Sequence, residues 1–269
     1  MKRIIYSIWD ELTEKHTSAN SYKQEQFEIY LDQLKAKHKM YADLCHADYH
    51  VFSIGPSRYQ DIQFAKLYEL EKLSEEYDEI LYLDMDVIPN TNKIIFNEFD
   101  LSKISLHIRP PPWIPKGKEL NKIFENSNYH FSYMNSWLKM VIKKSMLLVD
   151  DIVGENTIAN TGVICVNSDA IKKIELSEKL NEADRAYNLA FKDNFHPKRV
   201  TDAWTKNNEV FISYIIEKYN IDYNELGLRW NYILDSKIST YSPVGYFIHQ
   251  VNKDFEATLD EVQKYQSLE

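Results

Sequence analysis

The chain has 269 residues, of which 44% are hydrophobic and 13% aromatic, and its formal net charge is −9 at pH 7. This hydrophobic content is enough to form a sizeable buried core, and it excludes an intrinsically disordered chain. The acidic balance argues against nucleic-acid binding, because a phosphate backbone repels net negative charge, so an anionic small substrate would need local basic residues or a metal.

The first ninety residues alternate between strand and helix patterns. Short apolar runs indicate strands, and apolar side chains at helical spacing indicate helices. Their β-α-β-α-β order predicts a mostly parallel sheet covered by helices, with ligands beyond the carboxyl ends of its strands. The predicted strands span 3–9, 51–54 and 79–83, and the predicted helices span 21–44 and 60–76. The second helix is expected to turn four apolar side chains inward, namely Phe64, Leu67, Tyr68 and Leu70.

The rest of the chain has a less regular pattern. We expect a Pro-rich extended loop from Arg109, and loop-like structure over 190–205. The predicted strands are 105–108, 158–167 with an interruption at Asn160–Gly162, and 246–249. The predicted helices are two pieces within 119–149, one from Ser168, one over 208–219, and a short one from Phe255.

Neither a targeting segment nor a membrane span is predicted. The apolar run near the start is too short for a signal-peptide core and ends at Asp10, and no stretch reaches the roughly 18 apolar residues of a span. Cys45 and Cys165 are too few for a disulfide framework and lack zinc-site spacing, so we expect two buried thiols. These features together favour a cytoplasmic protein.

Two acids follow the third predicted strand. The apolar run from Ile80 leads directly to Asp84 and Asp86, so Asp84 is expected at the carboxyl end of a central strand. Residues i and i+2 of a strand point to one side, and two carboxylates held there repel each other unless a cation lies between them. Such a site suits Mg²⁺ or Mn²⁺, which takes its remaining ligands from phosphates. The alternative is a pair of solvated acids in a turn.

Four more segments complete an ordered set of motifs with LYLDMD at 81–86. They are IANTGVICVN at 158–167, NNEVF at 207–211, LRWNY at 228–232 and FIHQ at 247–250. The set resembles nucleotide-sugar glycosyltransferases of the GT-A fold, most closely the glycogenin and bacterial galactosyltransferase group, which is glycosyltransferase family 8-like. The resemblance covers nearly the whole chain, from residue 3 to residue 253.

The resemblance implies an α/β fold with a Rossmann-like mixed, mostly parallel sheet and helices on both faces. It implies a single domain over 1–269, with a nucleotide-binding half over about 1–100 and an acceptor-binding half over about 101–269. It also implies a metal site made of Asp84, Asp86 and His249. Two carboxylates suit Mg²⁺ or Mn²⁺, and an added imidazole favours Mn²⁺. The bound metal would bridge the two phosphates of a nucleoside diphosphate. The alternative for His249 is a histidine buried in an apolar strand.

Further residues are implied in donor binding. Lys66 and Lys253 would add positive charge at the diphosphate, although Lys253 departs from the family pattern, in which a glycine and a lysine follow the histidine at wider spacing. Ser7, Trp9 and Asp10 stand where the family holds the base and ribose; the alternative is a core Trp9 and a helix-capping Asp10. Asn160 and Thr161 interrupt an apolar strand, where sugar hydroxyls or backbone groups in a bulge would satisfy their side chains.

The catalytic assignment is implied by the segment after Asn207. The family's Asp-Gln pair appears here as Asn208 and Glu209, and Asp202 is a reserve candidate. Glu209 would stabilise an oxocarbenium-like species in a retaining enzyme, or deprotonate the acceptor hydroxyl in an inverting one. The alternative is that this segment begins a helix. Asn208 would then cap the helix, and the negative charge of Glu209 would interact favourably with the helix dipole.

Three segments are candidates for contact with the acceptor. Residues 109–118 form a Pro-rich loop with Trp113, Lys116 and Lys118, and residues 190–205 are rich in aromatic and basic side chains. Residues 137–144 mix apolar and basic side chains and suit a membrane surface, as a lipid-linked acceptor requires. The alternative for 137–144 is a core-facing helix with solvated lysines.

We therefore predict a metal-dependent hexosyltransferase that moves a sugar from a nucleotide-diphosphate donor to a hydroxyl of a sugar, lipid-linked or protein acceptor. The resemblance implies a UDP-linked donor and favours retention. The alternatives are an inverting transferase with Glu209 or Asp202 as base, and a non-catalytic carbohydrate-binding protein of the same fold. A nucleotidyltransferase would carry a Gly-rich loop after the first strand, but residues 10–15 contain no glycine. A metal-dependent phosphatase or nuclease would have more clustered acids and histidines.

Overall fold

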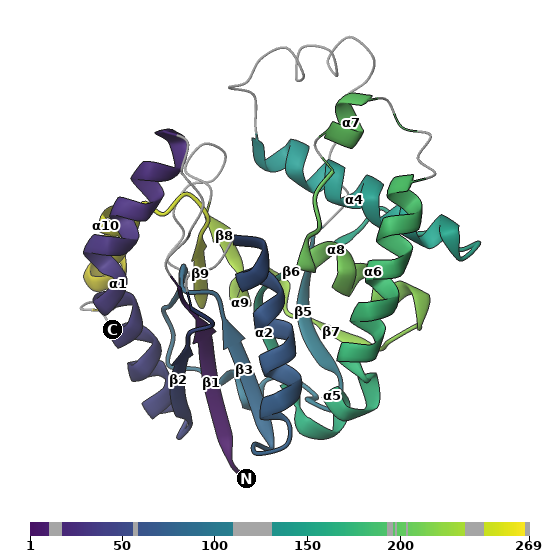
Figure 1. Cartoon of the computed structure of the whole chain (residues 1–269). Helices are drawn as coiled ribbons and strands as arrows, with labels where there is room; N and C mark the ends of the chain where they lie inside the picture. The colour runs from purple at the N-terminus through teal and green to yellow at the C-terminus, as the bar shows by residue number, and fades with distance from the viewer. Residues whose placement is uncertain are drawn as a thin grey trace. The chain divides into compact units, whose positions relative to one another are not determined.

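The computed structural model describes residues 1–10, 18–55, 59–109, 131–192, 196, 198–202, 204–234 and 245–266 (Figure 1). The chain divides into two compact units. The first comprises 1–107, 161–173 and 223–269, and the second comprises 108–160 and 174–222. This division differs from the predicted boundary near residue 100. Residues 161–173 and 223–269 return to the first unit, where their strands pair with its earlier strands.

A six-stranded sheet has the order β2-β1-β3-β6-β5-β7. Strand β1 pairs in parallel with β2 and with β3, β5 pairs in parallel with β7, and β6 runs antiparallel to β3. The expected mixed, mostly parallel sheet is thereby confirmed. The strands are β1 (Arg3–Ile8), β2 (Asp48–Phe52), β3 (Glu79–Leu83), β5 (Ile104–Arg109), β6 (Ile158–Asn167) and β7 (Tyr223–Glu225).

Helices α1 (Ser18–Leu44) and α2 (Tyr59–Leu73) cover opposite faces of this sheet. Tyr41 and other α1 residues share one apolar cluster with Ile5 and Leu81. Tyr6, the neighbour of Ile5 in β1, points the other way and donates a hydrogen bond from its hydroxyl to the carbonyl of Lys66 in α2, at 2.6 Å. Because successive strand residues alternate between faces, β3 has apolar contacts on both faces, and all five of its residues are buried.

A smaller sheet of three strands has the order β4-β9-β8. Strand β4 (Val87–Pro89) runs antiparallel to β9 (Phe247–Gln250), and β8 (Tyr232–Leu234) runs parallel to β9. The sequence analysis did not predict β4 or β8, because three residues are too few to show a period. The remaining elements of the first unit are η1 (Ile95–Asn97), α5 (Ser168–Ile174), α9 (Gly227–Trp230) and α10 (Phe255–Gln266), the last of which lies beside α1 (Figure 1).

The second unit is built on three helices that pack on one another, α4 (Phe131–Val149), α6 (Leu176–Lys192) and α8 (Asn208–Lys218). In α4, the partly buried Lys139 makes an ion pair with Glu209, and the fully buried Lys143 makes one with Glu217. These two lysines are therefore neither solvated nor free for anionic lipid. Among the described residues, no helix is long and apolar enough to cross a bilayer.

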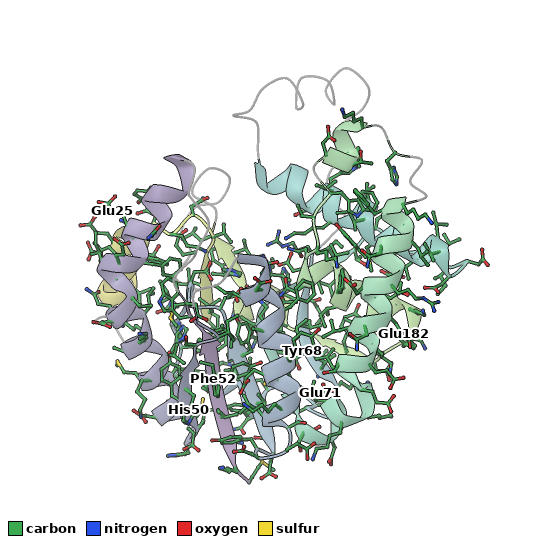
Figure 2. The ribbon with its side chains drawn as sticks, in the orientation of Figure 1. Glu25, His50, Phe52, Tyr68, Glu71 and Glu182 are labelled. Carbon is green, nitrogen blue, oxygen red and sulfur yellow. The ribbon has the colours of Figure 1, made fainter. Side chains whose placement is uncertain are left out.

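Three local predictions are wrong. Strand β6 is continuous through Asn160–Gly162, because backbone pairing carries these residues without a break. Tyr68 does not face inward: it is 46% exposed on α2 (Figure 2). Lys66, two residues earlier on α2, is buried instead. Residues 190–205 are not all loop, since α6 continues to Lys192 and α7 spans Lys198–Asp202. The predictions for 110–118, for 119–130 and for Glu11–Lys15 lie outside the described residues.

Candidate metal and donor site

Asp84 and Asp86 lie in the tight turn that joins β3 to β4. The amide of Val87 donates to the carbonyl of Asp84 at 2.9 Å, and the amide of Asp84 donates to the carbonyl of Gly162 at 2.8 Å. Strand β4 then pairs with β9 so that Val87 lies opposite His249. A sheet register therefore brings the histidine next to two acids that precede it by more than 160 positions.

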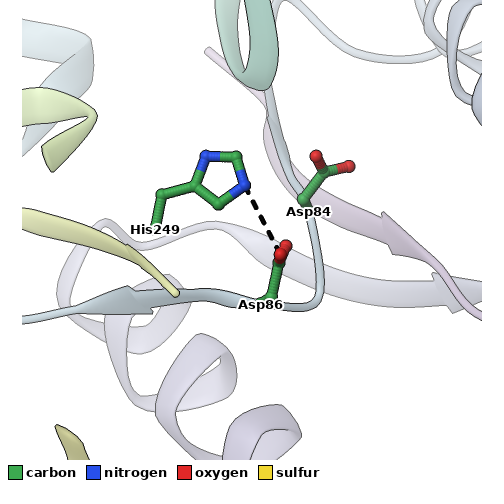
Figure 3. A group of neighbouring side chains, drawn as sticks. All are labelled: Asp84, Asp86 and His249. Atoms are coloured by element: carbon green, nitrogen blue, oxygen red, sulfur yellow. Dashed lines mark ion pairs between the residues drawn. The ribbon is translucent and has the colours of Figure 1, made fainter. Parts of the chain in front are cut away.

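The three predicted metal ligands form one cluster. One ligand atom from each of Asp84, Asp86 and His249 lies within 4.8 Å of the other two. The Nε2 of His249 is 3.4 Å from Oδ2 of Asp86, and the three side chains converge from β9 and from the β3–β4 turn (Figure 3). Asp86 is 7% exposed and His249 is 5% exposed, so this end of the site is largely screened from water.

Lys253 makes an ion pair with Oδ2 of Asp86. Burial by itself would raise the pKa of Asp86, but the charges of Lys253 and His249 outweigh it and hold the pKa below its ordinary range. The backbone of Lys253 has a φ of 64°, in the left-handed region where glycine is favoured. The chain thus adopts an unusual backbone conformation at the point where the Lys253 ammonium group reaches Asp86. It does so although the spacing between the histidine and the lysine differs from that in the family pattern.

Lys66 contributes a second positive charge to the cluster. Its ammonium group is 3.0 Å from Oδ1 of Asp84 and 3.0 Å from the carbonyl oxygen of Thr161, and the residue is 3% exposed. The hydroxyl of Tyr82 donates to the same oxygen of Asp84, and burial followed by the charge of Asp84 raises the pKa of Tyr82 far above its usual value. These contacts hold the side chain of Asp84 in place.

The residues present fit a divalent cation. Two carboxylates and one imidazole are a ligand set that Mn²⁺ accepts readily and that Mg²⁺ also tolerates. Like charges placed this close destabilise each other, and a cation relieves the repulsion. Asp84, Asp86 and His249 would hold the ion.

Two buried residues that the sequence analysis did not assign support this cluster. Asn231, which is 0% exposed, lies with Oδ1 3.1 Å from Nδ1 of His249. His38 in α1, also 0% exposed, donates from Nε2 to the carbonyl of Val87 at 2.6 Å. Asn231 stood within the motif at 228–232, whereas no sequence signal marked His38, since its partner is a backbone atom.

The residues predicted to bind the nucleotide are engaged within the protein. Ser7 is fully buried, and its hydroxyl is 3.1 Å from Nδ1 of His38. The Asp10 carboxylate accepts hydrogen bonds from Ser53 and from the amides of Ile54, at 2.7 Å, and Gly55, at 3.1 Å. Any contact of Asp10 with a donor would add to these bonds.

Trp9 is the more accessible of these end-of-strand residues. It is partly buried, and its ring packs at 4.5 Å, centroid to centroid, on the ring of Phe27 in α1. Nucleotide binding by Ser7, Trp9 and Asp10 stays a prediction.

The predicted catalytic residues belong to the second unit. Glu209 is 8% exposed, and its two oxygens accept hydrogen bonds from Nδ2 of Asn160, at 2.7 Å, and from Nζ of Lys139. Asn208 is buried and begins α8, but the N-cap is Asn207, whose side chain accepts from the amide of Glu209. Asp202 is exposed at the end of α7.

No protein-family model and no curated protein matches this chain. Solved structures do match over most of its length. A glycosyltransferase involved in the glycosylation of the major capsid of PBCV-1 is 15% identical, with 97% of this chain and 100% of that chain covered and a TM-score of 0.51. The galactosyltransferase LgtC, in complex with donor and acceptor sugar analogues, is 13% identical, with 92% and 87% covered and a TM-score of 0.47. Mouse xyloside xylosyltransferase 1 is 14% identical, with 92% and 98% covered and a TM-score of 0.42. At such identities the first likeness shows the fold, which is the GT-A fold of glycosyltransferases.

Proposed function

We propose that this protein is a metal-dependent glycosyltransferase that uses a nucleoside-diphosphate sugar as donor. The observation that carries the proposal is the cluster of Asp84, Asp86 and His249 after β3 of a GT-A sheet. The GT-A likeness extends over the whole of a solved glycosyltransferase chain. A sheet of this kind binds ligands beyond the carboxyl ends of its strands, which is where the two acids stand.

Each residue of the cluster has a distinct part in the proposal. Asp84, Asp86 and His249 would hold Mn²⁺ or Mg²⁺, which when bound neutralises the charge that develops on the leaving diphosphate. Lys66 orients the Asp84 carboxylate through a 3.0 Å contact. Lys253 brings a second ammonium group to the diphosphate, which an acidic protein must supply locally.

We assign Glu209 as the catalytic carboxylate, in the role of a fixed negative charge. Both of its oxygens already accept strong donors, the Asn160 amide and the Lys139 ammonium. A carboxylate bonded in this way is a weak proton acceptor but a well-oriented charge that can stabilise an oxocarbenium-like sugar. This geometry supports retention, and it disfavours Glu209 as the base of an inverting enzyme.

The donor and acceptor are proposed from chemistry alone. We propose a UDP-linked hexose as donor, with Mn²⁺ as the preferred ion because the ligand set includes an imidazole. The acceptor is a hydroxyl of a sugar, of a lipid-linked glycan or of a glycoprotein.

Turnover measurements test the proposal. The wild-type protein, a set of UDP-, GDP-, CDP- and dTDP-sugars and a panel of sugar acceptors are incubated with Mn²⁺ or with EDTA, and release of nucleoside diphosphate is followed. We expect release from one nucleotide class, dependent on metal, and a decrease of about 100-fold or more in Asp86→Asn. Asp43→Asn is the matched control, since Asp43 is an exposed acid on α1 of the same unit. Release that is equal in Asp86→Asn and wild type, or no release with any donor, would overturn the proposal.

A further inference from the structure

Asn231 lies where a side chain can control the ring of His249. It stands between α9 and β8, two residues before Ile233, which pairs with His249 in the β8–β9 ladder. The amide is fully buried, with Oδ1 3.1 Å from Nδ1 of the histidine. The opposite nitrogen of the ring, Nε2, faces Oδ2 of Asp86 at 3.4 Å.

The hydrogen-bonding chemistry of Asn231 determines that Nδ1 of His249 carries hydrogen. An amide oxygen can only accept a hydrogen bond, so the Nδ1 atom that faces Oδ1 of Asn231 must carry the hydrogen. Nε2 is then the ring nitrogen that faces the carboxylate of Asp86, where a bound cation would accept its lone pair. This arrangement is the one that an imidazole needs in order to ligate a cation through Nε2.

We propose that Asn231 is a positioning residue that selects the Nδ1–H tautomer of His249 and so presents Nε2 to a divalent cation. The inference rests on the proposed function, because it assigns a role toward the ion that the transferase would use. Its energetic basis is the hydrogen bond on the far side of the ring, which restricts ring rotation and raises the basicity of the ligating nitrogen.

His38 supplies an internal contrast within the same unit. Its Nε2 lies 2.6 Å from the carbonyl oxygen of Val87, which can only accept, so His38 carries its hydrogen on Nε2. Nδ1 of His249 and Nε2 of His38 are therefore each expected to carry hydrogen, and one spectrum can report both.

The first test needs only the wild-type protein without added metal. Long-range ¹H–¹⁵N spectra of ¹⁵N-histidine-labelled protein distinguish the tautomers, and His249→Gln and His38→Gln assign the signals among the eight histidines. We expect a hydrogen on Nδ1 of His249 and on Nε2 of His38. A His249 ring with no hydrogen on Nδ1 would overturn the proposal.

The second test measures the Mn²⁺ dissociation constant by electron paramagnetic resonance, in wild type and in three variants. We expect Asn231→Ala to weaken Mn²⁺ binding by about 10- to 100-fold and to reduce the ¹⁴N imidazole coupling in the spin-echo spectrum. Asn231→Asp keeps an acceptor and is expected to stay within about 3-fold of wild type. Asn90→Ala, the control, removes a side-chain amide that donates to the carbonyl of Gly245 at 3.2 Å, and should leave both readouts unchanged.

The outcomes separate the inference from the proposed function. If wild type binds no Mn²⁺, the metal site and the transferase proposal fail together. If wild type binds Mn²⁺ and Asn231→Ala matches it in affinity and in ¹⁴N coupling, only the role of Asn231 fails. Circular dichroism spectra establish whether each variant is folded. If Asn231→Ala is unfolded, the NMR measurement on wild type tests the role of Asn231 by itself.

Discussion

The ammonium group of Lys66 lies 3.0 Å from Oδ1 of Asp84, and only 4% of the Lys66 side chain is exposed. A charge buried this deeply depends on its partner, because removal of either one leaves the other without compensation. The pair ties helix α2 to the turn after β3, so it serves both the stability of the fold and the orientation of a proposed metal ligand.

Lys66→Met should therefore destabilise the protein more than loss of a surface pair does. We expect the free energy of unfolding in urea to fall by about 2–4 kcal/mol. Lys39→Met, which breaks an exposed pair with Asp43, should cost less than about 1 kcal/mol. Equal costs for the two variants would show that Lys66 and Asp84 do not depend on each other.

His38 gives the stability a defined pH dependence. Burial lowers the pKa of His38 from 6.5 to about 4, so between these values the unfolded chain binds a proton that the folded protein does not. The free energy of unfolding should thus fall by about 3 kcal/mol from this group as the pH drops from 7 to 4. Urea unfolding over this range should show the stability gap between wild type and His38→Gln narrowing toward low pH. His50→Gln, at an exposed position, is the control, and a gap that stays constant for His38→Gln would contradict the assignment.

Neighbouring lysines of α4 should differ strongly in how much their substitution destabilises the protein. Lys143 is fully buried and bonds to Glu217 and, at 2.8 Å, to the carbonyl of Thr157, whereas Lys144 bonds to Asn156 near the surface. We expect Lys143→Met to lower the unfolding free energy by about 3–5 kcal/mol and Lys144→Met to change it by less than about 1 kcal/mol. The double variant Lys143→Met with Glu217→Leu should recover most of the loss, because it leaves no buried charge unpaired. A double variant as unstable as Lys143→Met would contradict this account.

Glu209 should affect the chemical step more than donor binding. Because its oxygens are held by Asn160 and Lys139, we expect Glu209→Gln to lower kcat by about 100-fold or more with little change in the KM of the donor. The anomeric proton signal of the product, followed by NMR, should keep the configuration of the donor sugar. A product of inverted configuration would argue against retention and reassign the catalytic carboxylate.

The sequence predicted the parts of the fold that have strong local patterns. Strand β3 has the predicted bounds, and β6 spans the predicted residues because its apolar run is long. The short strands β4 and β8 were missed, since their pairing with β9 is set by tertiary contacts rather than by a period. Tyr68 was misplaced for a related reason: the buried position on α2 goes to Lys66, whose charge has a partner in Asp84.

The site shows the same contrast. Asp84 and Asp86 follow from the residue pattern, whereas His249 was found through the ordered motifs of a family, because a lone histidine in an apolar strand carries no chemical signal of its own. Asn231 contacts His249, which is 18 positions away, and His38 bonds to the carbonyl of Val87, which is 49 positions away. No local pattern marks either pair. Lys139 was predicted to face a membrane surface or solvent, because its partner, Glu209, is 70 positions away.

Calorimetric titration of nucleoside diphosphates tests the central claim most directly. UDP, GDP, CDP and dTDP are titrated into wild type and into Asp86→Ala, each with Mn²⁺ and with EDTA, and Asp43→Ala serves as the control. We predict that UDP binds wild type and Asp43→Ala only when Mn²⁺ is present, and that Asp86→Ala loses this binding. Failure of all four nucleotides to bind wild type with Mn²⁺, or equal binding of UDP by wild type and Asp86→Ala, would contradict a metal-dependent nucleotide-sugar site.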